Sequence, residues 1–192
     1  MGLVLVTAPA TEPVTLVETK AHLRVDITDD DVQIGSLVTA AREQLETDTR
    51  RALVTQTWDL VLDAFPREAK LELPLPPLAS VTSITYKDAD GITQTFPAGN
   101  YVVAVSEIFG RIVLKSGFTW PSTTLWSADA VAVRFVAGYG GAAAVPQTAK
   151  QAILLLVGHW YENREAVVVA GVTAREVPMG YERLMWLLRP SL

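Results

Sequence analysis

The segment from Ala152 to Glu165 constrains the fold most, because it predicts a helix with almost no polar face. It begins Ala-Ile-Leu-Leu-Leu-Val-Gly and ends in the aromatic and charged run His-Trp-Tyr-Glu-Asn-Arg-Glu. A helix that is apolar all round must be enclosed, either by its own domain or by neighbouring subunits. Aromatic residues and arginine are enriched in protein interfaces. The segment therefore favours assembly over catalysis, with Trp160, Tyr161 and Arg164 as candidate subunit or partner contacts.

The composition excludes several classes of protein. The chain has 192 residues, of which 49% are hydrophobic and 19% charged, so we expect one folded domain, or one domain carrying an insertion. A net charge of −5 argues against a protein that wraps nucleic acid tightly. There is no cysteine, which excludes disulfides and thiolate metal sites. The longest apolar run is far shorter than the roughly 20 residues of a membrane span, so no membrane partner is expected.

Residues 1–53 are expected to form the N-terminal helical part of the fold. Thr15 and Glu18 have the spacing of a capping box, which predicts a helix over Leu16–Arg24. Asp29–Asp31 is expected to cap the next helix, where acidic residues favour the positive end of the helix dipole. In that helix one apolar stripe has helical spacing and consists of Ile34, Val38, Ala41 and Leu45.

Residues 54–139 have the pattern of an antiparallel β-rich segment. Trp58, Leu60 and Leu62 alternate with polar residues, as in a half-buried strand. Asp88–Gly91 separates two strand-like runs and predicts a hairpin between Ser80–Tyr86 and Ile92–Phe96. Further strands are expected at Tyr101–Val105, Arg111–Leu114 and Ala130–Val136. This spacing of short strands favours a compact antiparallel sheet or a small barrel.

Residues 140–192 return to a helical pattern and are expected to complete the bundle. Pro146 suits the start of a helix over Gln147–Arg164, and a second, shorter helix is predicted over Tyr181–Arg189. The predicted class is α+β: a small helical bundle of N- and C-terminal helices with an inserted antiparallel β-rich segment. Two sequential α+β units are the alternative.

No group of residues in the sequence predicts an active site. His159 and Glu162 share a helical face, but a metal site in a bundle needs several more inward carboxylates, so a structural polar cluster is expected. His22 is expected to be solvated. Gly138–Gly141 lacks the Lys and Ser/Thr of a phosphate loop, and Asp29–Asp31 lacks the spacing of a calcium loop. No catalytic residue, metal or cofactor is expected, and a metal enzyme is the least favoured reading.

The loop over residues 106–126 offers an alternative function. It is rich in aromatic residues and close to two basic ones, the group being Tyr101, Phe109, Phe118, Trp120, Trp126, Arg111 and Lys115. Such a group could stack on bases or other ligands. The alternative is therefore a β-rich ligand- or nucleic-acid-binding module with helical flanks. Simple core packing of these aromatic residues is the competing interpretation.

Four segments resemble one known family. They are TLVETKAHLRVD at residues 15–26, RALVTQTW at 51–58, PPLASV at 76–81 and QAILLLVGHWYENRE at 151–165. Together they are similar, in order and over nearly the whole chain, to the head–tail connector (adaptor) proteins of tailed phages, which also occur in prophages and gene transfer agents. One departure is Arg50, where the family usually has glycine before the arginine; this affects a turn.

The resemblance implies a structural adaptor without enzymatic activity. Members form a ring under the portal vertex, extend the DNA channel and give the tail a docking surface. The implied partners are the portal protein, a tail-side connector or stopper, further copies of the chain in a dodecameric ring, and DNA only in passage. The implied location is the head–tail interface of the virion, with assembly in the host cytoplasm.

Two sets of residues are our own candidates for this role. Residue types that carry binding energy in interfaces gather near the C-terminus, and we expect portal or subunit contacts from Tyr181, Arg183, Trp186 and Arg189. Acidic side chains could line the channel and repel passing DNA, and the candidates are Glu43, Glu46 and Asp48.

Overall fold

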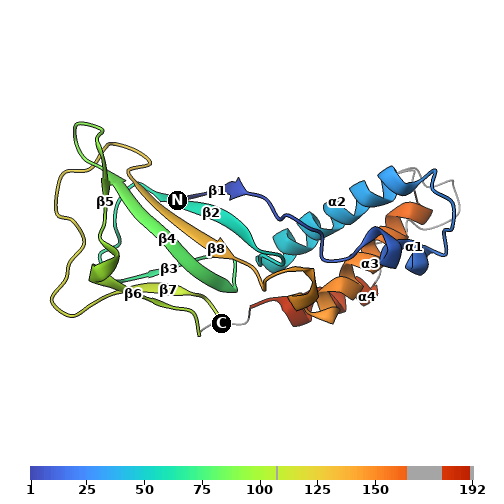
Figure 1. The fold of residues 1–192 in the computed structure, drawn as a ribbon. Helices are drawn as coiled ribbons and strands as arrows, with labels where there is room; N and C mark the ends of the chain where they lie inside the picture. The colour runs from blue at the N-terminus through green and yellow to red at the C-terminus, as the bar shows by residue number, and fades with distance from the viewer. Residues whose placement is uncertain (107, 164–178, 191–192) are drawn as a thin grey trace, which may run out of the picture. The chain divides into compact units, whose positions relative to one another are not determined.

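The computed structural model describes residues 1–106, 108–163 and 179–190 (Figure 1). The chain divides into two compact units. The sheet unit consists of Met1–Ala10 and Thr55–Tyr139, and the helical unit consists of Thr11–Val54 and Gly140–Leu192. Residues 1–10, which are predicted to belong to the N-terminal helical part, lie in the sheet unit.

The sheet unit contains a five-stranded antiparallel sheet with the strand order β1-β2-β8-β4-β5. Its strands are β1 (Gly2–Thr7), β2 (Gln56–Leu62), β8 (Val131–Ala137), β4 (Leu78–Lys87) and β5 (Thr93–Thr95). In the central strands Leu60 lies opposite Val133, and Val133 lies opposite Ile84. All three side chains are fully buried. Because side chains alternate along a strand, this row marks the core face of the sheet.

A second, three-stranded antiparallel sheet has the order β3-β7-β6. Its strands are β3 (Lys70–Glu72), β7 (Arg111–Leu114) and β6 (Tyr101–Ala104), and the short 3-10 helix η1 (Ala98–Asn100) precedes β6. Ile112 of β7 is fully buried. A Cβ at Gly110 would lie 2.3 Å from the Leu78 side chain, so only glycine fits between the two sheets at this point.

The predicted hairpin is confirmed by the pairing of β4 with β5. Asp88 closes its turn, because the Asp88 carboxylate accepts hydrogen bonds from the backbone N–H groups of Asp90 and Ile92 at 3.1 and 2.9 Å. Gly91 takes the positive φ of 78° that this turn requires. The predicted strands at 101–105, 111–114 and 130–136 correspond to β6, β7 and β8.

The helical unit contains α1 (Leu16–Leu23), α2 (Asp31–Thr49), the 3-10 helix η2 (Ala142–Ala144), α3 (Gln147–Glu162) and α4 (Met179–Leu188). The predicted capping box is present: the Thr15 hydroxyl accepts from the Glu18 N–H at 3.1 Å, and the Glu18 carboxylate accepts from the Thr15 N–H at 2.7 Å. The predicted stripe on α2 is also confirmed, since all four of its residues are buried.

The apolar helix predicted from the sequence is α3, and other helices of the helical unit enclose it. α3 packs against α1, α2 and α4. Ala152, Ile153, Leu156 and Val157 are each 1% exposed or less. Gly158 lies against His22 and Leu23 of α1, where an added Cβ would come within 3.5 Å of the imidazole. The α+β class expected from the sequence is therefore confirmed.

The predicted capping role of the aspartates before α2 is wrong in one respect. Asp30 occupies the N-cap position, but its side chain makes no capping hydrogen bond. Its carboxylate instead accepts a hydrogen bond from the Tyr161 hydroxyl of α3. Asp31 accepts from Lys20 of α1 at 2.6 Å. These two aspartates therefore join helices to one another, a use that their sequence position does not reveal.

Arg50 ends α2 in the left-handed conformation, with φ 52° and ψ 42°. Glycine adopts this conformation at little cost, which explains why the resembling family usually has glycine here. Among the helices that the structure describes, none has the length and hydrophobicity needed to cross a membrane.

Candidate assembly interface

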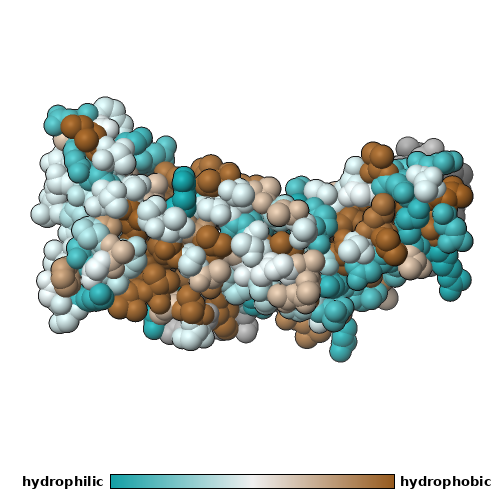
Figure 2. Space-filling model, viewed as in Figure 1, coloured by the Kyte–Doolittle hydropathy of each residue, from teal (hydrophilic) through white to brown (hydrophobic). Residues whose placement is uncertain are grey.

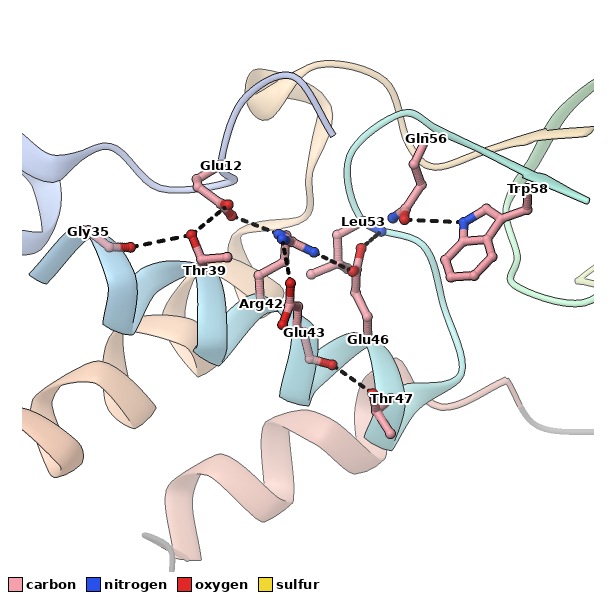
Figure 3. A network of polar contacts seen from close by, with 10 residues as sticks. All are labelled: Glu12, Gly35, Thr39, Arg42, Glu43, Glu46, Thr47, Leu53, Gln56 and Trp58. Carbon is pink, nitrogen blue, oxygen red and sulfur yellow. Dashed lines mark hydrogen bonds and ion pairs between the residues drawn. The ribbon is translucent and has the colours of Figure 1, made fainter. Parts of the chain in front are cut away.

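Arg42, a buried arginine of α2, connects this helix to the two ends of the segment Thr11–Val54 (Figure 3). The Arg42 side chain is 7% exposed and meets three carboxylates. Its Nε donates to Glu12 at 2.8 Å, its Nη1 donates to Glu46 at 2.8 Å, and its Nη2 lies 3.3 Å from Glu43. Burial alone would lower the pKa of Arg42, but the hydrogen bonds and charges of Glu12 and Glu46 outweigh it and raise the pKa.

The same network holds the backbone on both sides of α2. Glu12 precedes α1 and also accepts from the Thr39 hydroxyl at 3.0 Å. Glu46 accepts from the backbone N–H of Leu53, which follows α2, at 2.8 Å. One guanidinium therefore fixes the positions at which the chain enters and leaves this part of the helical unit.

The three acidic channel candidates differ in their surroundings. The Glu46 side chain is 12% exposed and belongs to the Arg42 network. Asp48 accepts a hydrogen bond from the Tyr181 hydroxyl at 2.6 Å. Glu43 is the exposed member, with 66% of its side chain accessible. The channel-facing role stays a prediction, and Glu43 is the residue whose charge reaches solvent most fully.

One face of α4 packs into the helical unit. Tyr181 is 3% exposed and Leu188 is 7% exposed. Arg189 donates from Nε to the Asp48 carbonyl at 2.9 Å, and Arg51 donates to the Leu188 carbonyl. Burial and the hydrogen bond to Asp48 raise the pKa of Tyr181 far above its ordinary value. Tyr181, predicted as a portal contact, is therefore a core residue that fixes α4 to the end of α2.

The opposite face of α4 is exposed and apolar. Met179, Trp186 and Leu187 are 86%, 65% and 71% exposed. With Arg183, which is also exposed, they follow the spacing i, i+4, i+7 and i+8 and so share one side of the helix. The Arg189 guanidinium lies 4.9 Å from the Trp186 ring centroid, a cation–π contact that holds the indole in place. We call Met179, Arg183, Trp186 and Leu187 the α4 surface.

Two of the four residues of the α4 surface, Arg183 and Trp186, are predicted from their residue types, whereas Met179 and Leu187 are not. The sequence does contain a signal for this surface, namely apolar residues on both sides of a ten-residue helix. Such a helix has more apolar surface than one packing contact buries. Hydrophobic side chains reach the surface on both units (Figure 2).

The end of α3 is engaged rather than free. Trp160 and Tyr161 are half-buried, and Tyr161 donates to Asp30. Arg164 lies outside the described residues. His159 lies 3.5 Å from the Asn163 side-chain amide. In the described part of the chain, no group of three potential metal ligands comes together around His159 and Glu162 or elsewhere.

Two of the five aromatic residues proposed as a stacking platform stack on other rings of the sheet unit. Trp120 stacks on Phe65 with ring centroids 5.1 Å apart, and its indole N–H donates to the Glu68 carbonyl at 2.8 Å. Tyr101 stacks on Phe96. Phe118 and Trp126 are the exposed members, at 45% and 47%. The core-packing interpretation therefore accounts for Tyr101 and Trp120 but not for Phe118 and Trp126.

Comparison with protein families gives a match to the head completion protein family over residues 14–175. The chain belongs to this family. The head–tail connector family expected from the sequence is thereby confirmed, and it is a family of structural virion proteins rather than of enzymes. No curated protein matches the chain.

Three solved structures match over 100% of this chain and 97% of theirs, each with 27% sequence identity. The first is the neck of an empty gene transfer agent particle, computed with C6 symmetry, with a TM-score of 0.82. The second is the virion of a native gene transfer agent particle, with a TM-score of 0.81. The third is the neck of a native particle, computed with C12 symmetry, with a TM-score of 0.80. The chain therefore shares both of its units with a neck protein.

Proposed function

We propose that this head completion protein assembles as a ring, with twelve copies, under the portal of a phage or phage-related particle. The ring extends the DNA channel and presents a docking surface to a tail-side connector. The observation that carries the proposal is the full-length match to a chain in particle necks computed with sixfold and twelvefold symmetry. A ring is built from heterologous contacts, in which two different patches of each subunit meet. The protein then resides in the virion after assembly in the host cytoplasm.

The α4 surface is the proposed portal contact. It combines an exposed tryptophan, two further apolar side chains and an arginine on a helix whose other face is fixed by Tyr181 and Leu188. Tryptophan and arginine dominate interface hot spots, and a rigid helix loses little entropy when it docks. The packed face also shows that removing α4 altogether is a poor test, because deletion would expose the core around Tyr181 and Leu188.

A point variant on the exposed face is the sharper experiment. Trp186→Ala should weaken co-assembly with the portal of the same particle by about tenfold or more, the range of a hot-spot residue. The free energy of unfolding should change by less than about 0.5 kcal/mol, since the side chain is mostly exposed. Binding to immobilised portal rings and denaturant unfolding measure the two quantities.

Val32→Ala is the matched control, because Val32 is an apolar residue of α2 that is 85% exposed and lies outside the α4 surface. It should leave portal binding unchanged. Equal binding by wild type and Trp186→Ala would contradict the assignment of the α4 surface to the portal.

A further inference from the structure

The two open sheets of the sheet unit each have one protected edge. β5 is three residues long and polar, and β4 beside it carries register shifts at Leu78/Ser80 and Val81/Ser83. β3 is also short, and its Lys70 lies 3.7 and 3.9 Å from Glu68 and Glu72. Short strands, bulges and charged side chains are the devices by which proteins prevent edge strands from pairing with other chains.

The other edge of the five-stranded sheet is β1, which is twice as long as β5 and has no charged side chain. All six of its residues are exposed. Leu3, Val4, Leu5 and Val6 are 40%, 54%, 45% and 40% exposed, so apolar side chains reach solvent on both faces of the strand. The register is regular from Gly2 to Leu5 and shifts between Leu5 and Thr7, so the regular row of backbone groups covers residues 2–5. Residues 1–11 contain no charged side chain.

The free edge of the three-stranded sheet, β6, is shorter and more covered than β1, since it has four residues and only Val102 among them is exposed. Val102 and Val105, in and just after this strand, are each 52% exposed. Residues 96–106 contain no charged side chain. In the order of each sheet β1 and β6 are the outermost strands, and no further strand among the described residues pairs with either (Figure 1).

We propose that β1 of one copy pairs with β6 of the next copy, so that a sheet continues from subunit to subunit. This inference rests on the proposed ring. An unprotected apolar edge is a template for strand addition, in which backbone hydrogen bonds supply affinity. One unit that carries two different edges of this kind meets the requirement of a heterologous, repeating contact. Neither β1 nor β6 has a lysine or arginine among its own residues, which argues against nucleic acid as the occupant.

Cross-linking tests the pairing directly, because the full chain has no cysteine of its own. Val4→Cys and Leu5→Cys place a thiol on opposite faces of β1, and each is combined with Val102→Cys on β6. A flexible bis-maleimide applied to the concentrated, purified protein should give a ladder of oligomers with one of these two pairs. Each single-cysteine variant should give no ladder, and the pair Val17→Cys with Val102→Cys, which moves one thiol to exposed α1, should give none either.

A charge on the edge provides the second test. Val4→Lys should reduce the oligomeric fraction by more than about tenfold, whereas Gln94→Lys on the protected β5 edge should leave it unchanged. Mass measurement over a range of concentrations gives both fractions.

The outcomes separate the edge pairing from the ring itself. If wild-type mass rises with concentration but neither double variant gives a ladder, the edge pairing is wrong and the ring stands. A dimer from Val4→Cys alone, without longer products, would show symmetric β1 pairing and overturn the proposal. A wild type that remains monomeric at every concentration, with no ladder, overturns the edge pairing and counts against the ring.

Discussion

At the scale of single residues, the helical unit depends on polar side chains that sequence patterns assign to its surface. Glu46 and Asp48 are predicted to face the channel and Tyr181 a partner, yet each is at least partly buried and bonded within the unit, as is Arg42. Removing a guanidinium that is buried among carboxylates strongly destabilises a protein, because the remaining buried charges lose their compensation. These residues therefore stabilise the fold, while the exposed side chains beside them remain for partners.

Arg42→Ala should destabilise the protein by about 3 kcal/mol, since Glu46 and Glu12 lose their shared cation. Arg42→Lys should restore little of this, because one ammonium cannot reproduce the geometry of the guanidinium fork. Glu43→Gln is the control: its side chain is 66% exposed, and the change should cost less than about 0.5 kcal/mol. Denaturant unfolding at neutral pH measures all three, and an Arg42→Ala protein as stable as wild type would refute the argument.

The raised pKa of Tyr181 predicts that the protein loses stability at alkaline pH. This pKa is raised by burial first and by the hydrogen bond to Asp48 second, so the folded chain favours the protonated phenol. That contribution is fully present below the unfolded pKa of about 10 and is lost as pH rises through the raised folded-state pKa.

Tyr181→Phe should therefore lower the unfolding free energy by about 1 kcal/mol at pH 7 and flatten its decline above about pH 10. Unfolding curves between pH 7 and 11 provide the test. Tyr101, whose pKa is also raised by burial, should account for slope that remains. An unaltered slope in Tyr181→Phe would show that this phenol does not control alkaline stability.

At the scale of elements, the end of α2 is where the chain departs from the glycine usual in the resembling family. Arg50 has φ 52° and ψ 42°, a left-handed conformation in which the Cβ of a non-glycine residue is crowded. The Arg50 N–H still bonds to the Thr47 carbonyl at 3.3 Å, so the turn is retained at a cost in strain.

Arg50→Gly should be more stable than Arg50→Ala by about 1 kcal/mol, because glycine removes the crowding at positive φ. The two variants lose the same charge, so the comparison isolates the backbone term. Thermal or denaturant unfolding measures the difference. Equal stabilities would mean that the α2 terminus relaxes away from the left-handed conformation.

The elements that the sequence predicted best are those with local signals. The capping box set the start of α1, the helical spacing around Ile34 set the core face of α2, and Arg111–Leu114 was assigned to a strand with the same bounds as β7. β1 was missed because Gly2–Thr7 has no alternation of polar and apolar residues and pairs with residues 57–61, far along the chain. The roles of Asp30 and Tyr181 were missed for the same reason, since both depend on long-range hydrogen bonds.

At the scale of the whole molecule, the charge of the chain bears on its proposed passage role. A net charge of −5 gives DNA little to bind, and the exposed Glu43 adds to local repulsion. A protein of this kind can surround a channel without retaining what passes through it.

We therefore expect double-stranded DNA to bind more weakly than a Kd of about 100 µM at physiological salt, the weak end of non-specific binding. Fluorescence anisotropy with a labelled duplex, repeated with a single strand, measures this. Micromolar binding that falls steeply with added salt would contradict the channel role and favour the nucleic-acid-binding alternative. Phe118→Ala and Trp126→Ala would then locate the contact.

The division of the chain between its units has a consequence for biosynthesis. The backbone passes between sheet unit and helical unit three times, after Ala10, after Val54 and after Tyr139. Once the ribosome has released residue 139, every strand of both sheets has been made, while α3 and α4 have not. Because domains generally fold during synthesis, the nascent chain can complete its sheets first. At that stage α1 and α2 have not yet received α3, the helix against which both pack. Among the described helices and strands α4 is made last, so the proposed portal contact is added to a subunit whose sheet edges have already been synthesised.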